Sequence, residues 1–504
     1  MSNVKDSREP SDSLSAAQEA AVGGVLSAYP VAGELGRRFQ QAGFRLALVG
    51  GSVRDALLGR LGNDLDFTTD ARPEQILDLL KPWADAIWDV GIAFGTVGAR
   101  KKARPTADPV HGELFDFQIE ITTYRSEAYD RNSRKPEVSY GDTIEEDLVR
   151  RDFSVNAMAV ALPEVVFVDP HHGLADLAAK VLRTPGTPEQ SFSDDPLRML
   201  RAARFAAQLH FEVAPEVVTA MTEMAERIDI VSAERIQAEL NKLLLSRNPR
   251  QGLLLLVDTG LAARVLPELP ALRLERDEHH RHKDVYEHSL TVLEQAIDLE
   301  TDGPDLTLRL AALLHDIGKP RTRRFEDGGG VSFHHHELVG AKMTKKRLRE
   351  LKYSNEIVED VAKLVELHLR FHGYGDGEWT DSAVRRYVRD AGPLLPRLHK
   401  LTRSDCTTRN RRKAAQLAAT YDALEERIAR LAQQDELDAI RPDLDGNQIM
   451  ELLAVPPGPV VGRAYKHLLE LRLDNGPMEY AAAVSALREW WAEQPEYRNE
   501  AAAR

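Results

Sequence analysis

The stretch that most constrains the fold is an apolar strand that ends at two glycines and leads into a helix. Leu46 to Val49 are apolar and precede Gly50 and Gly51, and a short helix is predicted from Ser52 onward. A strand that turns into a helix at glycines leaves backbone N–H groups without partners, and such groups bind anions. The sequence therefore predicts a phosphate-binding turn next to a strand of a sheet.

Two carboxylates follow that turn on a second predicted strand. Asp64 and Asp66 are two residues apart, and Phe67 continues the strand. Side chains two positions apart lie on the same face of a strand, so both carboxylates project together. Paired carboxylates beside a phosphate-binding turn favour Mg²⁺ in contact with a nucleoside triphosphate. Either half alone is more often an ordinary turn, but their order and spacing favour the site. A dinucleotide-binding fold is disfavoured because the glycines do not follow G-x-G-x-x-G.

These residues resemble the motif of the polymerase-β-like nucleotidyltransferases, in the branch that contains bacterial CCA-adding enzymes and poly(A) polymerases. The resemblance rests on Gly-Gly-Ser-Val-Arg-Asp at 50–55 and Asp-Leu-Asp at 64–66. It implies an α+β fold, with a polymerase-β-like head that has a mixed sheet, followed by an all-α neck and body. It also implies nucleotide addition to RNA 3′ ends without a nucleic-acid template, with Asp64 and Asp66 as catalytic ligands of Mg²⁺.

Further segments of the head match motifs of that branch. The predicted strand at 115–122 alternates and places Glu120 on its polar face, where it is either a third catalytic acid or an ordinary exposed side chain. The motif at 150–157, Arg-Arg-Asp followed by Asn-Ala, implies contacts to triphosphate and ribose. Taken alone, that motif would read as a solvated run of charges. The resemblance assigns nucleotide binding to Gly50, Gly51, Ser52, Arg54, Arg151, Asp152 and Asn156.

A predicted helix that begins near Ser193 carries the residues expected to choose the base. A capping hydroxyl, two acids and Pro196 form a strong helix start. Asp195 and Arg198 are three residues apart and share one face of that helix. Arginines continue the face at the same spacing, at Arg198, Arg201 and Arg204. Ion pairs within a surface helix would explain the acids but not three arginines in this pattern, so we predict that these arginines bind nucleotide.

Base selection by this helix follows from hydrogen bonding. Cytosine and adenine both present an amine donor beside an unprotonated ring nitrogen, whereas uracil and guanine present a carbonyl beside an N–H. Asp195 can accept from the amine and Arg198 can donate to the ring nitrogen. The stretch resembles the nucleotide-selecting helix of the branch, with Asp194 where that helix has Glu. We therefore predict that the protein itself acts as the template for C and A.

A second constellation of metal ligands lies in the C-terminal half. One buried histidine is more often a core residue than a ligand, but here histidines and aspartates recur with the order and spacing of an HD phosphohydrolase site. Imidazoles with carboxylates suit a divalent transition metal better than Mg²⁺ alone. The expected cofactors are therefore Mg²⁺ in the head and a divalent transition metal, or Mg²⁺, at the HD site. The predicted HD ligands are His288, His315, Asp316, His336, His368 and Asp405.

Length and composition limit the class of protein and its location. A chain of 504 residues is too long for one core. The expected parts are a flexible lead at 1–28, a nucleotidyltransferase head at 29–185, a helical neck and body at 186–270, an HD domain at 271–420 and a helical tail at 421–504. The single cysteine fits the reducing cytoplasm, and no apolar run is long enough to span a membrane. A net charge of −14 still allows a local basic groove for RNA.

The predicted function is the addition of CCA to the 3′ end of tRNA from CTP and ATP, with HD phosphohydrolase activity as a possible second function. A poly(A) polymerase or an enzyme that adds only A is the alternative within the branch, and the HD module speaks against the former. Alternatives of another class are an HD phosphohydrolase whose head only binds nucleotide and a catalytically silent RNA-binding protein. The motifs predict nothing about the oligomeric state.

Overall fold

The structure is a computed structural model of the whole chain. It describes residues 19, 22–24, 30–60, 62–88, 91–92, 95–102, 116–128, 137–273, 284–326, 330–371, 379–407, 410–435 and 441–494. The chain divides into two compact units, residues 1–267 (unit 1) and 268–504 (unit 2). Most of the predicted lead at 1–28 lies outside the described residues. The boundaries predicted within each unit stay predictions.

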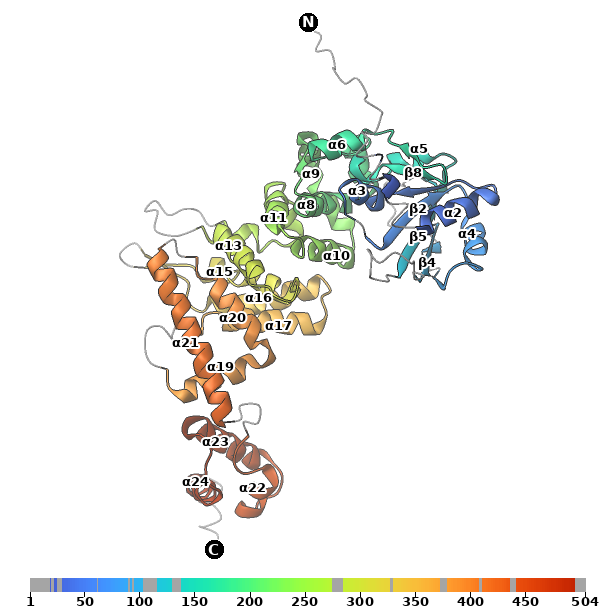
Figure 1. Ribbon diagram of the computed structural model, residues 1–504. Helices are drawn as coiled ribbons and strands as arrows, with labels where there is room; N and C mark the ends of the chain where they lie inside the picture. Colours follow the sequence, from blue (N-terminus) through green and yellow to red (C-terminus); the bar gives the residue numbers. More distant parts are fainter. Residues whose placement is uncertain are drawn as a thin grey trace. The chain divides into compact units, whose positions relative to one another are not determined.

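Unit 1 is built on a seven-stranded mixed sheet, part of which is labelled in Figure 1. The strand order is β3-β4-β5-β2-β1-β8-β9. β2 and β5 pair in parallel, and the other neighbours pair antiparallel. The strands are β1 (Leu46–Val49), β2 (Asp64–Thr69), β3 (Ala86–Trp88), β4 (Thr96–Lys101), β5 (Phe117–Thr123), β8 (Ala159–Leu162) and β9 (Val166–Val168). The predicted mixed sheet is confirmed.

The positions of the helices that pack on this sheet follow from the spacing of apolar residues and from proline. The spacing of Val31, Leu35 and Phe39 predicts a helix over 30–43, and α2 (Pro30–Gln41) buries these three residues. A proline suits the first helical position, which needs no N–H donor, and so predicts a helix over 73–80; α4 (Pro73–Leu80) begins there. All four residues of β1 are buried, which agrees with a central strand that is covered on both faces.

One predicted strand is wrong. The sequence predicts a strand over 90–97, but in the structure Gly95 has a φ of +77° and lies in a turn. An extended strand cannot pass through that left-handed conformation. β4 therefore begins only at Thr96, directly after the glycine. The sequence also predicts a basic, proline-containing insertion at 101–112 and a basic loop at 129–136, and both lie mostly outside the described residues.

From residue 191 onward the sequence pattern predicts mostly helices, and helices dominate the rest of unit 1. Two short sheets, β6–β7 and β10–β11, accompany them. The remaining elements are α3 (Gly51–Leu57), β6 (Arg125–Ala128), β7 (Glu137–Tyr140), α5 (Ile144–Val149), η2 (Ser154–Asn156), α6 (Gly173–Ala179), β10 (Val181–Leu182), α7 (Pro188–Asp194), α8 (Leu197–Leu209), β11 (Glu212–Val213), α9 (Pro215–Glu223), η3 (Ala225–Ile230), α10 (Ala233–Leu244), α11 (Pro249–Asp258) and α12 (Leu261–Val265).

Figure 1 labels most of the helices of unit 2, and the described residues of this unit contain one short sheet besides them, β12–β13. Its elements are η4 (Pro270–Leu272), α13 (Val285–Asp298), α14 (Leu306–Leu314), α15 (Lys319–Thr322), β12 (Arg324–Glu326), β13 (Gly330–Ser332), α16 (His336–Glu350), α17 (Asn355–Leu367), α19 (Asp381–Ala391), η5 (Gly392–Leu394), α20 (Leu395–Ser404), α21 (Arg411–Asp435), α22 (Gly446–Leu453), α23 (Pro459–Asn475) and α24 (Tyr480–Glu493). The last three helices share an apolar core of their own that includes Ile449, Leu468, Leu487 and Trp491. No helix in the described part of the chain combines the length and apolar character needed to cross a bilayer.

Candidate active site and metal centre

The acidic face of unit 1 is formed by β2 and β5. Leu65 and Phe67 point into the core, with 2% and 1% of their surface exposed. Asp64 and Asp66 alternate with them and are exposed on the opposite face. β5 runs parallel to β2, and Glu120 is the register partner of Asp66. The structure therefore brings the three predicted catalytic acids onto one face of two adjacent strands.

The negative charge of each of these carboxylates makes ionisation of its neighbours less favourable. Loss of hydration raises the pKa of Asp66; the positive charge of Arg151 opposes this shift, and the negative charge of Asp64 adds to it. Loss of hydration, followed by the charges of Asp66 and Asp64, also raises the pKa of Glu120. A bound divalent cation would relieve this repulsion. Because all three donors are carboxylate oxygens, the set fits Mg²⁺, with phosphate and water oxygens completing the coordination.

The glycine turn brings the backbone close to this acidic face. Gly50 has a φ of +69°, and a Cβ placed there would lie 3.1 Å from Nη1 of Arg151 and 3.8 Å from Oδ2 of Asp66. The backbone conformation therefore favours glycine, and the close approach leaves little space for a side chain. Ser52 connects the turn to β2, since its hydroxyl donates to the carbonyl oxygen of Asp64 at 3.2 Å and accepts from the N–H of Asp66 at 3.1 Å.

A buried acid that the sequence analysis did not single out organises the arginine motif. Asp147 of α5 is fully buried and accepts hydrogen bonds from Arg150 at 2.6 Å, Arg151 at 3.1 Å and the hydroxyl of Thr68 at 3.1 Å. Burial opposes its charge, but the two guanidinium groups outweigh burial and lower the pKa of Asp147 to about 2. The signal in the sequence was the spacing of three and four residues from this acid to the two arginines.

A chain of hydrogen bonds links α3, η2 and α8. Nη1 of Arg54 donates to Oδ1 of Asn156 at 2.6 Å, and Nδ2 of Asn156 donates to Oδ1 of Asp152 at 3.0 Å. Oδ2 of Asp152 accepts from Nε of Arg201 at 2.8 Å. Although burial opposes it, the charge of Arg201 holds the pKa of Asp152 well below its usual range. Four residues predicted to bind nucleotide are thus joined in one network.

A second acid, Glu239 of α10, was also missed as a site residue. It is 4% exposed. Its carboxylate lies 2.9 Å from Nε of Arg204 and 3.7 Å from Nη1 of Arg201. It therefore balances two of the arginines that α8 presents. The sequence analysis predicted a nucleotide contact for both arginines but gave no hint of this partner, which is 35 residues or more away along the chain.

The helix that carries these arginines begins later than the sequence predicts. α7 ends at Asp194, Asp195 is extended with φ −142° and ψ 101°, and α8 begins at Leu197. The predicted cap at Ser193 is wrong because that residue lies within the last turn of α7. Instead, Oδ1 of Asp195 accepts from the N–H of Leu197 at 3.1 Å, since an acid just before a helix can bond its first free N–H groups.

The predicted base-selecting residues are held by different neighbours. Oδ2 of Asp195 accepts from Nη2 of Arg235 at 2.7 Å. Arg198 is 8% exposed and donates from Nη1 to the hydroxyl of Ser191 at 3.0 Å. Its Nη2 donates to the carbonyl oxygen of Arg150. Among the described contacts, no bond joins the side chains of Asp195 and Arg198, so each is oriented separately.

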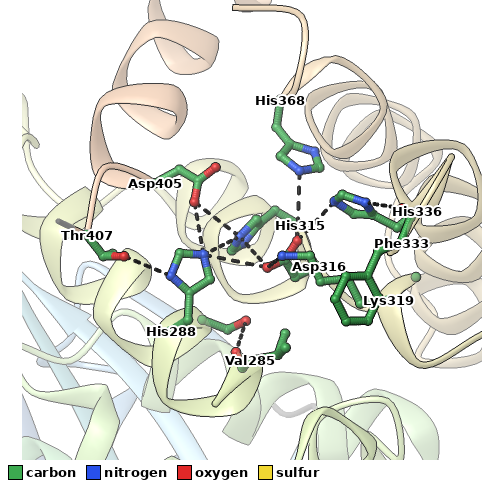
Figure 2. A network of polar contacts seen from close by, with 12 residues as sticks. Val285, His288, His315, Asp316, Lys319, Phe333, His336, His368, Asp405 and Thr407 are labelled. Carbon is green, nitrogen blue, oxygen red and sulfur yellow. Dashed lines mark hydrogen bonds and ion pairs between the residues drawn. The ribbon is translucent and has the colours of Figure 1, made fainter. Parts of the chain in front are cut away.

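The six predicted HD ligands come together in unit 2 (Figure 2). They form two groups, and within each group the ligand atoms lie within 4.8 Å of one another. The first group is His288, His315 and Asp405, and the second is Asp316, His336 and His368. Among the described residues, no comparable group occurs in unit 1. Four histidines, from α13, from the start of α16 and from the residues that follow α14 and α17, therefore meet two aspartates. The first and last ligands are 117 positions apart in the sequence.

Asp316 connects the two groups, as Figure 2 shows. Its Oδ2 lies 3.2 Å from Nε2 of His315 and 3.5 Å from Nε2 of His288. Its Oδ1 lies 3.2 Å from Nε2 of His336 and 3.9 Å from Nε2 of His368. One carboxylate therefore faces both groups with a different oxygen, which is the arrangement of a bridging ligand between two cations.

The histidines direct their Nε2 atoms toward this centre. Nδ1 of His315, His336 and His368 lies 2.8, 2.8 and 2.7 Å from the carbonyl oxygen of the residue three positions earlier. An Nδ1–H that donates to a carbonyl leaves the lone pair on Nε2, where a metal can bind it. Nε2 of His336 and of His368 is buried and has no hydrogen-bond partner among the described residues. Burial, followed by the charge of His315, lowers the pKa of His368 to about 3 and keeps it neutral. The residues fit a divalent metal.

Comparisons with known proteins decide the family. The model of the "Poly A polymerase head domain" matches residues 46–183, the "Probable RNA and SrmB- binding site of polymerase A" matches 210–272, and the HD domain matches 285–432. An A-adding tRNA nucleotidyltransferase of Deinococcus radiodurans is 34% identical over 89% of this chain and 96% of its own length. The chain belongs to the tRNA nucleotidyltransferase and poly(A) polymerase family. The resemblance inferred from the motifs is therefore confirmed.

Other members of this family are similar over different lengths. A CCA-adding enzyme of Levilactobacillus brevis is 42% identical over 44% of this chain and 52% of its own length. One of Streptococcus suis is 29% identical over 88% of this chain and 91% of its own. The crystal structure of the Bacillus stearothermophilus CCA-adding enzyme in complex with CTP covers 95% of this chain and 98% of that chain, with a TM-score of 0.63 and 23% identity. These neighbours confirm the predicted fold class.

Proposed function

We propose that this member of the family adds CCA to the 3′ end of tRNA, using CTP and ATP and no nucleic-acid template. The observation that carries the proposal is the exposed face shared by Asp64, Asp66 and Glu120, with Arg151 and the glycine turn beside it. The likeness to tRNA nucleotidyltransferases supports this substrate. Such an enzyme would work where tRNA matures, in the cytoplasm, and it needs no membrane partner.

Asp64 and Asp66 would hold Mg²⁺, with Glu120 as a third acid on the neighbouring strand. When bound, Mg²⁺ supplies positive charge to the triphosphate and lowers the pKa of the RNA 3′-hydroxyl. Arg151 already lies beside Gly50, and its charge opposes the rise that loss of hydration causes in the pKa of Asp66. Its guanidinium is thus placed to donate to phosphate oxygens next to the metal ligands.

The hydrogen-bonded network behind this face positions the rest of the nucleotide. Asp152 and Asn156 offer an acceptor and a donor that suit ribose hydroxyls, and Arg54 and Arg201 flank them. Because each side chain is already bonded to the next, little reorganisation is needed when the nucleotide binds. The pair of bonds from Arg201 keeps Asp152 ionised and therefore an acceptor.

Asp195 and Arg198 would select the base. The carboxylate accepts from the amine of C or A, and the guanidinium donates to the ring nitrogen. Arg235 and Ser191 hold these two groups in place. A uracil or guanine edge would offer the wrong hydrogen-bonding group to both the partly buried Asp195 and the buried Arg198. The cost is roughly 1 to 3 kcal/mol for each. That cost is large enough to exclude UTP and GTP without a nucleic-acid template.

For unit 2 we propose a metal-dependent phosphohydrolase centre. Its four imidazoles and two carboxylates would hold divalent transition-metal ions better than Mg²⁺. The bridging position of Asp316 fits two ions, one in each ligand group. Nζ of Lys319 lies 2.7 Å from Oδ2 of the same aspartate, where an ammonium group could also meet a phosphate oxygen.

The decisive experiment uses tRNA transcripts that end before CCA, after the first C and after both C residues. Purified protein is incubated with each transcript and CTP alone, ATP alone or both, and the products are sequenced. We expect two C additions with CTP, A addition only to the transcript ending in CC, and full CCA with both nucleotides. The variant Asp64→Ala is the control for contaminating activity.

Other products would contradict the proposal in distinct ways. Extension only of the CC-ending transcript, by one A, would identify an A-adding enzyme, as the name of the Deinococcus relative describes that protein. Long A tails on any RNA would identify a poly(A) polymerase. No extension of any transcript, with folded protein and Mg²⁺ present, would refute nucleotide addition altogether.

A further inference from the structure

A single phenylalanine ring in α8 is surrounded by three arginines. Phe205 is 6% exposed. Its ring centroid lies 4.1 Å from Cζ of Arg204, 5.2 Å from Cζ of Arg54 and 5.5 Å from Cζ of Arg201. The ring of Phe153 meets it edge to face, with centroids 5.8 Å apart and an interplanar angle of 86°. All three guanidinium groups are within the range of a cation–π contact.

Three positive charges so close together, and mostly buried, repel one another. The side chains of Arg54 and Arg204 are each 9% exposed. Burial, followed by the charges of Arg201 and Arg54, lowers the pKa of Arg204 to about 10. Arg54 donates from Nε and Nη2 to the carboxylate of Asp55, and Arg201 donates to Asp152. Glu239 forms ion pairs with Arg201 and Arg204. The negative face of an aromatic ring attracts a cation as well, and it does so without accepting a hydrogen bond.

We propose that Phe205 is a positioning residue that holds Arg54, Arg201 and Arg204 in the arrangement that receives the nucleotide. The proposal rests on the function proposed above, because these arginines are its nucleotide-binding residues. A carboxylate fixes the edge of a guanidinium group, and a ring face fixes its plane. Two restraints of different geometry therefore orient each group while leaving other N–H donors for phosphate oxygens. Phe205 itself contacts no substrate in this scheme.

A fluorinated series tests the proposal without changing the shape of the side chain. Phe205 is replaced in the full chain by phenylalanine with one, two and three ring fluorines, each of which weakens the negative ring face. We expect the KM for ATP and for CTP to rise stepwise, by about tenfold in total, because cation–π contacts of buried cations are worth that order of affinity. The kcat and the KM for tRNA should change by less than about twofold. Phe205→Leu should show the full loss in one step.

Phe39 supplies the matched control, since it is fully buried in α2 on the same unit. Fluorination there should leave every kinetic constant unchanged. A flat KM across the Phe205 series, or an equal response at Phe39, would overturn the proposal and leave the ring a packing residue. Direct ATP binding, measured by calorimetry on the same variants, separates this idea from the proposed function. If the wild type extended no tRNA but its ATP affinity still fell stepwise with fluorination, the reaction would be refuted and the positioning role retained.

Discussion

Asp147 gives the sharpest test of how the head is held together. Asp147→Asn keeps the volume of the side chain but removes the charge that two arginines share. Breaking a buried ion pair by removing one partner costs roughly 3 to 5 kcal/mol. The arginines here are 15% and 19% exposed, and the amide oxygen can still accept one bond. We therefore expect the free energy of unfolding of unit 1 to fall by about 2 to 3 kcal/mol.

The pKa of the same group gives an independent magnitude. Its pKa is about 2 in the folded protein, against an ordinary value of 3.8. At about 1.4 kcal/mol per pKa unit, that difference corresponds to roughly 2 to 3 kcal/mol. Because the folded pKa is depressed, this stabilisation is fully present above about pH 5 and is lost as the pH falls toward 2. The asparagine variant does not titrate. The difference between wild type and variant should therefore be constant from pH 7 to 5 and shrink by pH 3.

Pulsed hydrogen exchange across a urea series measures this difference for the relevant part of the chain. The midpoints are read on peptides from α5 and β2, so unfolding of the other unit does not interfere. Glu145→Gln is the control, because that residue is exposed in the first turn of the same helix. It should change the free energy of unfolding by a few tenths of a kcal/mol, about the value of one helix-end charge. A difference for Asp147→Asn that is below about 0.5 kcal/mol, or that stays constant down to pH 3, would refute the reasoning.

Three further outcomes are expected. Asp64→Ala or Asp66→Ala should lower the rate of nucleotide addition by about a thousandfold or more without weakening tRNA binding in filter assays. Addition at wild-type rates would show that the active site lies elsewhere. The double variant His315→Ala, Asp316→Ala should lose bound transition metal, measured by mass spectrometry, and any phosphatase activity, while CCA addition persists; loss of both activities in a folded variant would show one functional unit. Ser191→Ala should lower the CTP-over-UTP preference about fivefold, roughly the worth of one hydrogen bond, and an unchanged preference would remove this serine from base selection.

Sequence patterns predicted the bounds of those helices and strands that begin or end for reasons of their neighbouring residues alone. The apolar run that forms β1 ends at two glycines, and α4 begins at a proline, so both were predicted with their observed bounds. The alternation around Glu120 likewise predicted the face it occupies on β5. Where two nearby residues could both begin a helix, the sequence did not predict which one does. Ser193 and Asp195 are both residue types that cap helices, but in the structure Ser193 lies in the last turn of α7, and it is Asp195 that bonds the N–H of Leu197 at the start of α8.

The partners of charged groups could not be predicted in the same way. Asp152 and Arg201 are 49 residues apart and share two hydrogen bonds, but either residue alone reads as part of a solvated charged run. Spacing along a helix reveals only partners three or four positions away, as for Asp147. The sequence therefore identified residues of the nucleotide site through their resemblance to a motif, while the network that orients them required the fold.

In the HD centre, the orientation of single ligands depends on neighbouring residues, whereas their convergence depends on the tertiary fold. Three of its histidines bond a carbonyl three residues earlier through Nδ1. Local backbone therefore fixes the tautomer of each: the last turn of a helix for His315 and His368, and the segment before α16 for His336. Convergence depends instead on a close approach of backbones. A Cβ on Gly318 would lie 2.1 Å from the carbonyl oxygen of His336, and no neighbouring atom could yield that much space. Gly318 is therefore a contact point, and it allows the segment that carries Asp316 to meet the start of α16, which carries His336.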